Sequence, residues 1–315
     1  MKKSSDLSGS FLNQPRLTPA DVQAQDIAIL GAPHGTPYNE RNEVGYVVET
    51  RSASAPGAIR VAANESSTNI DHFDFDLGGP LMGDGRRRLV DCGDLDLQAQ
   101  DGQTNRAAIT NATAAILARQ ATPLLLGGDD SVPIPFLAAF ADRGPVDILQ
   151  IDAHIDWRDS IGGEPLGYSS TMRRASEQPF VRSITQVGMR GVGSARAGEV
   201  DAALEWGARL ITVTESRRLG AQGIADLIPI GGTLLIHIDC DAFDTSVCPA
   251  VNAPTPGGFM FNEVADIVRS AIAAHGLGGF SIVELVPDED RNMISAIVAA
   301  RITCNAIGAL ARYNQ

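Results

Sequence analysis

Short apolar runs alternate with longer Ala- and Leu-rich segments along most of this 315-residue chain. Such alternation is typical of βαβ units, in which a helix connects two parallel strands. The apolar runs predict strands at 26–30, 89–91, 123–126, 147–151, 184–187, 210–213, 233–238 and 279–283. The segments between them predict helices at 105–119, 133–141, 195–206 and 261–274. Several strands are apolar on both faces, which predicts an α/β fold of three α-β-α layers around a central, mostly parallel, eight-stranded sheet.

The chain shows no internal repeat and no linker rich in Gly, Ser and Pro after its first 24 residues. We therefore expect a polar N-terminal arm over 1–24 and a single domain over 25–315. Residues 32–56 lack a clear periodicity, which predicts loops near one rim of the sheet.

The formal net charge of −13 disfavours nucleic acid and anionic membranes as partners and suits a cationic ligand. The N-terminus lacks the apolar run of a signal peptide, and no stretch of about 18 consecutive apolar residues occurs. We therefore expect a cytoplasmic protein without a membrane span. The four cysteines form no CxxC pattern, and reduced core thiols are the simplest interpretation.

One apolar run ends directly in a group of side chains that bind metals, Asp152, His154 and Asp156. In an extended chain, residues two apart face the same side, so these three side chains can converge on one point. The convergence predicts a metal site. A polar strand end with a capping aspartate is the alternative interpretation.

Two further predicted strands end in carboxylates. One is followed by Asp239 and Asp241, and the other by two glycines, expected to permit a tight turn, and then by Asp129 and Asp130. Burying like charges together is costly unless protons or cations neutralise them. Ligands of α/β sheets collect at the carboxyl ends of the strands, so we expect the three acidic ends to meet.

Oxygen ligands with few imidazoles and no thiolate favour hard or borderline ions such as Mn²⁺, with Ni²⁺ or Co²⁺ as alternatives to it. Two ions about 3.5–4 Å apart can lower the pKa of a shared water and polarise a substrate. Hydrolysis at such a site needs no protein nucleophile. The sequence therefore predicts a two-metal hydrolytic centre.

Three motifs occur in the order and approximate spacing of the signatures of the arginase and agmatinase (ureohydrolase) superfamily. They are GGDDS at 127–131, DAHIDWRD at 152–159 and DCDAFD at 239–244. Four further segments resemble the same family, at 54–60, 91–94, 186–191 and 279–287. The resemblance covers nearly all of the expected domain. It implies an arginase-like fold, two divalent ions (Mn or Ni), hydrolysis of C–N bonds in linear amidines and a hexameric assembly.

The resemblance implies six metal ligands, which are Asp130, Asp152, His154, Asp156, Asp239 and Asp241. Among them, Asp152 and Asp239 would bridge the two ions. Glu284 matches the family's glutamate that contacts the guanidino group of the substrate, and Asp156 would also hold the substrate. Tyr168 occupies the remaining catalytic position.

Two residues depart from the family pattern. Asp130 stands where the family has His, in GGDHS, so one ion loses its imidazole; the added negative charge reduces its Lewis acidity and raises the pKa of the shared water. Tyr168 aligns with a His that transfers a proton to the leaving amine. A tyrosine with a pKa of about 10 is a poor proton shuttle near neutral pH.

These departures lead to two hypotheses. In the first, the chain is a subunit with a degenerate metal site, of reduced or absent occupancy, that supports an active paralogue in a mixed hexamer, like the non-catalytic subunit of a metformin-hydrolase-like heteromer. In the second, it is a self-sufficient Mn- or Ni-dependent hydrolase of a guanidino or biguanide substrate, in homo-hexamers. The products would be urea or guanylurea and an amine. A metallophosphoesterase is a third class, but its G-N-H-[DE] motif does not occur in the sequence.

The other histidines are assigned no chemistry. His72, His237 and His275 are interpreted as structural. His34 either lines the mouth of the substrate site or is solvated in a loop.

Overall fold

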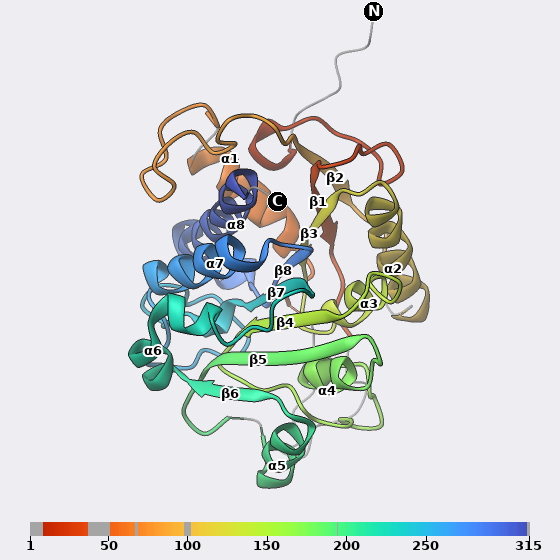
Figure 1. Ribbon diagram of the computed structural model, residues 1–315, viewed down its shortest axis with the longest axis vertical. Coiled ribbons are helices and arrows are strands. Elements are labelled where there is room, and N and C mark those ends of the chain that lie inside the picture. The colour runs from red at the N-terminus through yellow and green to blue at the C-terminus, as the bar shows by residue number, and fades with distance from the viewer. Residues whose placement is uncertain (1–8, 37–50, 67–68, 98–101, 194, 314–315) are drawn as a thin grey trace, which may run out of the picture.

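The computed structural model describes residues 9–36, 51–66, 69–97, 102–193 and 195–313. Its strands form one eight-stranded sheet in which every neighbouring pair is parallel (Figure 1). In chain order they are β1 (Ile27–Ala32), β2 (Leu89–Asp94), β3 (Thr122–Gly127), β4 (Val146–Ile151), β5 (Val181–Met189), β6 (Arg209–Thr212), β7 (Thr233–Asp239) and β8 (Gly279–Val283). The spatial order is β2-β1-β3-β8-β7-β4-β5-β6, so β3, β8, β7 and β4 lie side by side.

Helices cover both faces of the sheet. They are α1 (Ala55–Ser66), α2 (Gly102–Ala118), α3 (Pro133–Ala138), α4 (Thr171–Ser176), α5 (Ala197–Trp206), α6 (Val213–Ala225), α7 (Phe261–His275) and α8 (Ile294–Arg312). The sheet has one hydrophobic core on each face, and successive residues of a strand point alternately into the two cores. Ile27 and Ile29 pack in a core with α1, α6, α7 and α8, while Ala28 and Leu30 pack in a core with α2, α3, α4 and α5. Both faces of a strand are therefore apolar, and the predicted three-layer fold is confirmed.

The predicted strands are all present, β8 with the predicted ends and the others with shifted ends, and the four predicted helices correspond to α2, α3, α5 and α7. Helical periodicity does not predict α1, α4, α6 or α8. A kink at Gly220, where φ is 68°, interrupts the pattern of α6. α8 is buried over most of its length, so its sequence lacks the polar face that marks an amphipathic helix.

By length and composition alone, α8 could cross a membrane, the one helix of that kind in the part of the chain that the structure describes. Of its most apolar stretch, 72% is buried inside the protein. It packs against α1, α7 and β8. The apolar residues of α8 therefore pack in the core of this domain.

The expected N-terminal arm is, from residue 9 onward, packed against the domain. Phe11, in the 3-10 helix η1 (Phe11–Asn13), is fully buried beside α1. The next residues run parallel to the middle of β2, where the Leu17 N–H donates to the Asp91 carbonyl (3.1 Å) and the Asp91 N–H donates to the Pro15 carbonyl (3.0 Å).

Asp91 joins this N-terminal segment, β2 and α1 through its buried carboxylate. It accepts two hydrogen bonds from Arg60, from Nε at 2.8 Å and Nη2 at 3.0 Å, and one from the Phe11 N–H at 2.6 Å. Burial alone would raise the pKa of Asp91, but Arg60 outweighs it and holds this pKa below its ordinary value of 3.8. The pair therefore stabilises the fold as long as Asp91 is charged.

We expect Asp91→Asn to reduce the free energy of unfolding by about 3–5 kcal/mol, because it removes the buried counter-ion of Arg60 and leaves only the partly exposed Asp94 paired with it. Urea denaturation near pH 7 measures this loss. The difference from the native chain should shrink as the pH falls from about 4, the pKa of the unfolded chain, through the lower pKa of Asp91 in the folded protein, because the folded carboxylate becomes protonated over this interval. Asp84→Asn, at an exposed ion pair with Arg86, is the control and should leave the midpoint unchanged. Equal effects of the two substitutions would contradict this assignment.

Candidate metal centre

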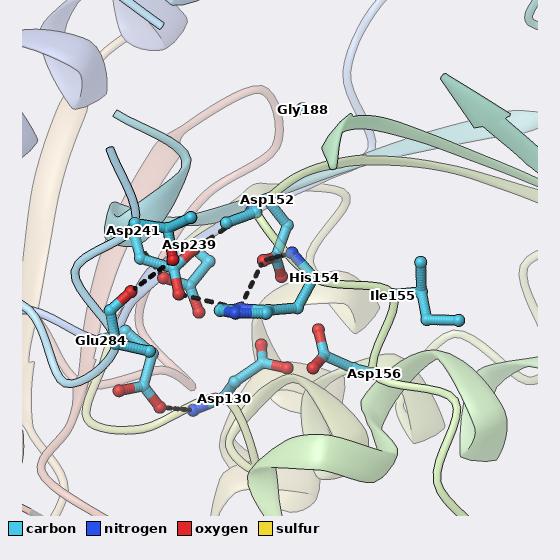
Figure 2. A network of polar contacts seen from close by, with 12 residues as sticks. Asp130, Asp152, His154, Ile155, Asp156, Gly188, Asp239, Asp241 and Glu284 are labelled. Carbon is cyan, nitrogen blue, oxygen red and sulfur yellow. Dashed lines mark hydrogen bonds and ion pairs between the residues drawn. The ribbon is translucent and has the colours of Figure 1, made fainter. Parts of the chain in front are cut away.

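The adjacency of β3, β8, β7 and β4 brings four acidic strand ends to one edge of the sheet. Each strand is followed by carboxylates of the predicted site, and Figure 2 shows them around the imidazole of His154. The six carboxylates are Asp130, Asp152, Asp156, Asp239, Asp241 and Glu284. All six are buried. The three acidic ends expected to meet do so, with β8 as a fourth.

The segment from Asp152 to Asp156 is not the extended continuation of a strand that its spacing predicts. β4 ends at Ile151, and Asp156 has a left-handed φ of 43°. The chain bends, and two short contacts keep the side chains together: the His154 N–H donates to Asp152 Oδ1 (2.7 Å), and Gln150 Nε2 donates to Asp152 Oδ2 (2.6 Å). The bend therefore brings the three side chains together, which the predicted extended strand was expected to do.

Asp239 and Asp241 are arranged by a 3-10 turn, η3 (Cys240–Ala242), directly after β7. The Asp241 N–H donates to Asp239 Oδ1 at 2.7 Å, and Asp241 Oδ1 accepts from the Ala153 N–H at 3.1 Å. Asp241 Oδ2 lies 3.0 Å from His154 Nδ1. These contacts connect the end of β7 to the end of β4.

The GGDDS turn presents one aspartate to the site and uses the other to hold the loop. Asp129 accepts from the Thr36 N–H at 3.0 Å, and its own N–H donates to the His34 carbonyl at 3.1 Å. A Cβ on Gly128 would lie 1.9 Å from that carbonyl oxygen. Gly128 does not have a positive φ, so glycine is required here by this close approach and not by the predicted tight turn. Asp130 is left to face the centre.

The electrostatics of the centre are dominated by negative charge. Burial raises the pKa of Asp130, Asp156 and Asp239 well above its ordinary value, and the neighbouring carboxylates raise it further. Burial opposes the charge of His154, but Asp152 and Asp241 outweigh it and raise the pKa of His154 to about 12. One imidazolium cannot neutralise six carboxylates. The centre requires protons or cations.

The side chains fit divalent ions. Asp152, His154 and Asp241 form one group whose ligand atoms all lie within 4.8 Å of one another, and Asp130, Asp152 and His237 form a second. Asp152 belongs to both groups, as expected of a bridging ligand. Asp156 and Asp239 lie outside these two groups, and their predicted metal contacts stay predictions.

Glu284 lies beside the centre in a constrained conformation. It follows β8 with a left-handed φ of 68°, which is unusual for a glutamate. Its Oε1 accepts from the Asp130 N–H at 2.8 Å, and its Oε2 accepts from Asn252 Nδ2. Burial, reinforced by Asp129, raises the pKa of Glu284 to about 8. Strained residues of this kind concentrate at functional sites.

Tyr168 begins the 3-10 turn η2 (Tyr168–Ser170), directly before α4. The first turn of α4 is held at the centre, because the N–H groups of Met172 and Arg173 both donate to the Asp156 carbonyl at 3.1 Å. Tyr168 is half-buried on this segment. Its predicted part in proton transfer stays a prediction.

His34 is buried, contrary to the interpretation of a solvated loop residue. Its Nδ1 lies 3.2 Å from Asn105 Nδ2, and burial, assisted by the charge of Arg106, lowers the pKa of His34 to about 4. Its neighbours 37–50 lie outside the described residues, and so does most of the loop predicted over 32–56.

Two residues of the site were missed by the sequence interpretation. His237, interpreted as structural, lies with Nε2 at 2.6 Å from Asp130 Oδ1. Gln150 donates through Nε2 to both Asp152 (2.6 Å) and Asp156 (2.8 Å). Each stands two residues before a predicted ligand, and the period of two along a strand would have placed it on the same face.

A model of the arginase family matches residues 25–308. The proclavaminate amidinohydrolase of Streptomyces clavuligerus is 28% identical over 93% of this chain and 91% of its own length, and the N(1)-aminopropylagmatine ureohydrolase of Thermococcus kodakarensis is 27% identical over 82% and 85%. The solved structure of the former covers 97% of this chain and 98% of its own, with a TM-score of 0.81 at 24% identity. That of Trypanosoma cruzi formiminoglutamase with Mn²⁺ covers 96% and 100%, with a TM-score of 0.78 at 20% identity.

The fold and its acidic edge are thus those of an arginase-like α/β protein. This chain belongs to the arginase family, as its three motifs indicate. Membership in that family leaves the metallophosphoesterase interpretation without support.

We expect Mn²⁺ to raise the Tm of the protein, because it neutralises buried carboxylates only in the folded state. At about 100 times the Kd the gain is ~2.7 kcal/mol. Differential scanning fluorimetry with and without a chelator measures it. A Tm that Mn²⁺ and Ni²⁺ both leave unchanged would show that these residues do not hold a metal.

Asp156→Asn should have two opposite effects. Asparagine tolerates the left-handed backbone and removes one buried acid, so the metal-free Tm should rise by roughly 1–2 °C, the shift that about 1 kcal/mol causes in a domain of this size. The additional rise on Mn²⁺ binding should shrink. Asp201→Asn, on the exposed face of α5, is the matched control and should change neither value. A lower metal-free Tm in Asp156→Asn would contradict the assigned repulsion.

Proposed function

We propose that this chain hydrolyses a C–N bond of an amidino or guanidino compound at the centre formed by the six predicted ligands. The observation that carries the proposal is the burial of six carboxylates around one imidazole in a member of the arginase family. Relatives that match most of the chain are named amidinohydrolase and ureohydrolase, which supports the same class of reaction.

A small cationic substrate suits this centre. A planar guanidinium donates paired N–H bonds to carboxylates, and Glu284 is positioned to accept them. The Asp130 N–H and Asn252 hold the two oxygens of Glu284 in place, and each oxygen retains a further lone pair. The net charge of −13 also favours a cationic ligand.

Mn²⁺ or Ni²⁺ held by these residues would lower the pKa of bound water and polarise the substrate. Side chains of the protein would bind the substrate and transfer the proton. Asp156 and Glu284 hold the guanidinium in place, and Tyr168, on the segment attached to Asp156, is the candidate that returns a proton to the leaving amine. The proposed products are urea, or a urea-like fragment, and an amine.

We further propose that the chain acts in the cytoplasm within a hexamer that includes a paralogous subunit. Asp130 and Tyr168, which replace two family histidines, support this dependence on a partner. The second candidate is a self-sufficient hydrolase in a homo-hexamer, and the position of His237 beside Asp130 favours it.

Purified alone with Mn²⁺ or Ni²⁺, the chain should release little amine from guanidino and biguanide compounds, and release should rise when the paralogous subunit of the same genome is added. Amine release and bound metal are measured together. Turnover by the lone chain that the paralogue does not increase would establish the self-sufficient hydrolase instead.

In the active assembly, Glu284→Gln should lower kcat/KM by roughly 10–100-fold, equivalent to the about 1.5–3 kcal/mol that a hydrogen bond to a charged group contributes. Bound metal should not change, because Glu284 is assigned to the substrate. Glu177→Gln, at the surface pair with Arg173, is the control and should keep full activity. Loss of metal together with activity in Glu284→Gln would assign Glu284 to the ions.

A further inference from the structure

We propose that His237 is a metal ligand of this centre, and that it supplies from β7 the imidazole that Asp130 fails to supply from the GGDDS turn. The inference rests on the metal centre of the proposed function but not on any partner subunit. Its ligand group is Asp130, Asp152 and His237, whose ligand atoms lie within 4.8 Å of one another.

The first support is a set of polar atoms without hydrogen bonds. His237 Nε2 and Asp130 Oδ1 lie 2.6 Å apart, and their side chains are only 4% and 3% exposed. Neither atom has a hydrogen bond of acceptable geometry within the described residues, and Asp130 Oδ2 has none either. A proton between the pair could satisfy at most one contact. A cation beside them would satisfy all three atoms at once.

The second support is the orientation of the ring. The register of β7 and β8 pairs His237 with Ser281, and His237 Nδ1 lies 2.9 Å from Ser281 Oγ. When Nδ1–H donates to this hydroxyl, the lone pair of Nε2 points at Asp130 and Asp152. Imidazoles that bind metals are held in this way, by a hydrogen bond from the second ring nitrogen.

The same contacts resemble a nucleophilic triad of Ser281, His237 and Asp130, but the surroundings of Ser281 argue against it. The cavity on that side has a volume of about 20 Å³ and is lined largely by apolar side chains, Phe136 and Met172 among them. That volume holds about one water molecule. A guanidino compound does not fit in this cavity beside the hydroxyl, so Ser281 is assigned to orient the ring.

An exchange of ligand types follows from this geometry. In the family signature, the turn after β3 provides an imidazole. In this chain that turn provides a carboxylate, and the imidazole comes from β7, which β8 separates from β3, two residues before Asp239. The total becomes two imidazoles, His154 and His237, and the departure at Asp130 no longer deprives one ion of nitrogen ligands.

The test counts the histidines that bind metal. The full chain, labelled with ¹⁵N-histidine, is titrated with Zn²⁺ as a diamagnetic probe that accepts imidazole and carboxylate ligands. Of the five histidines in the chain, two should show ring-nitrogen resonances shifted by the metal. A single shifted histidine would overturn the role of His237 and leave the metal centre standing. No shifted histidine would overturn the metal centre as well.

His237→Asn assigns the second resonance and should weaken the binding of one Zn²⁺ equivalent by at least roughly tenfold. The matched control is His275→Gln, at the end of α7, where Nε2 contacts the Ala225 carbonyl at 2.9 Å; it should change neither affinity nor the shifted resonances. Circular dichroism verifies the fold. If His237→Asn does not fold, Ser281→Ala is decisive, because it keeps the ring, removes its Nδ1 partner and should weaken the same equivalent roughly 10–100-fold. Unchanged affinity in the folded variant would contradict the proposal.

Discussion

Six carboxylates occupy one buried region at the carboxyl edge of the sheet, and their mutual repulsion is the constraint to which the surrounding structure responds. Carboxylates this close cannot all stay charged without compensation. Backbone N–H groups, Gln150 and His154 donate to several of them, and two groups of ligand atoms are arranged as a cation would require. The parallel sheet makes this possible because it places four strand ends side by side at one edge.

The strands and the acidic ends could be predicted from sequence because each is a local pattern. The alternation of apolar runs fixed the strands, and the burial of both strand faces fixed the layers. α8 could not be found in this way, because a helix buried on nearly all sides has no polar face. The packing of the arm could not be predicted, because it depends on Asp91 and Arg60, residues distant in the sequence.

Within the site, sequence reasoning found the ligands that form motifs and missed those that do not. Asp152, His154 and Asp241 stand in recognisable spacings, whereas His237 and Gln150 look like ordinary strand residues. The role of His237 follows from the register between strands: His237 pairs with Ser281 on the adjacent β8, and its ring reaches Asp130 in the turn after β3. Register of this kind is a property of the folded sheet. The bend at Asp156, where φ is positive, was missed for a similar reason, since the Asp156 carbonyl accepts hydrogen bonds from α4, which follows later in the chain.

The left-handed conformations of Asp156 and Glu284 have a consequence for anyone who engineers this protein. A side chain held there costs roughly 1–2 kcal/mol, and glycine would relieve it. A screen for heat resistance alone would therefore enrich glycine at these two positions and discard the carboxylates that we propose hold the substrate. Stabilising substitutions should be sought elsewhere, with both positions fixed.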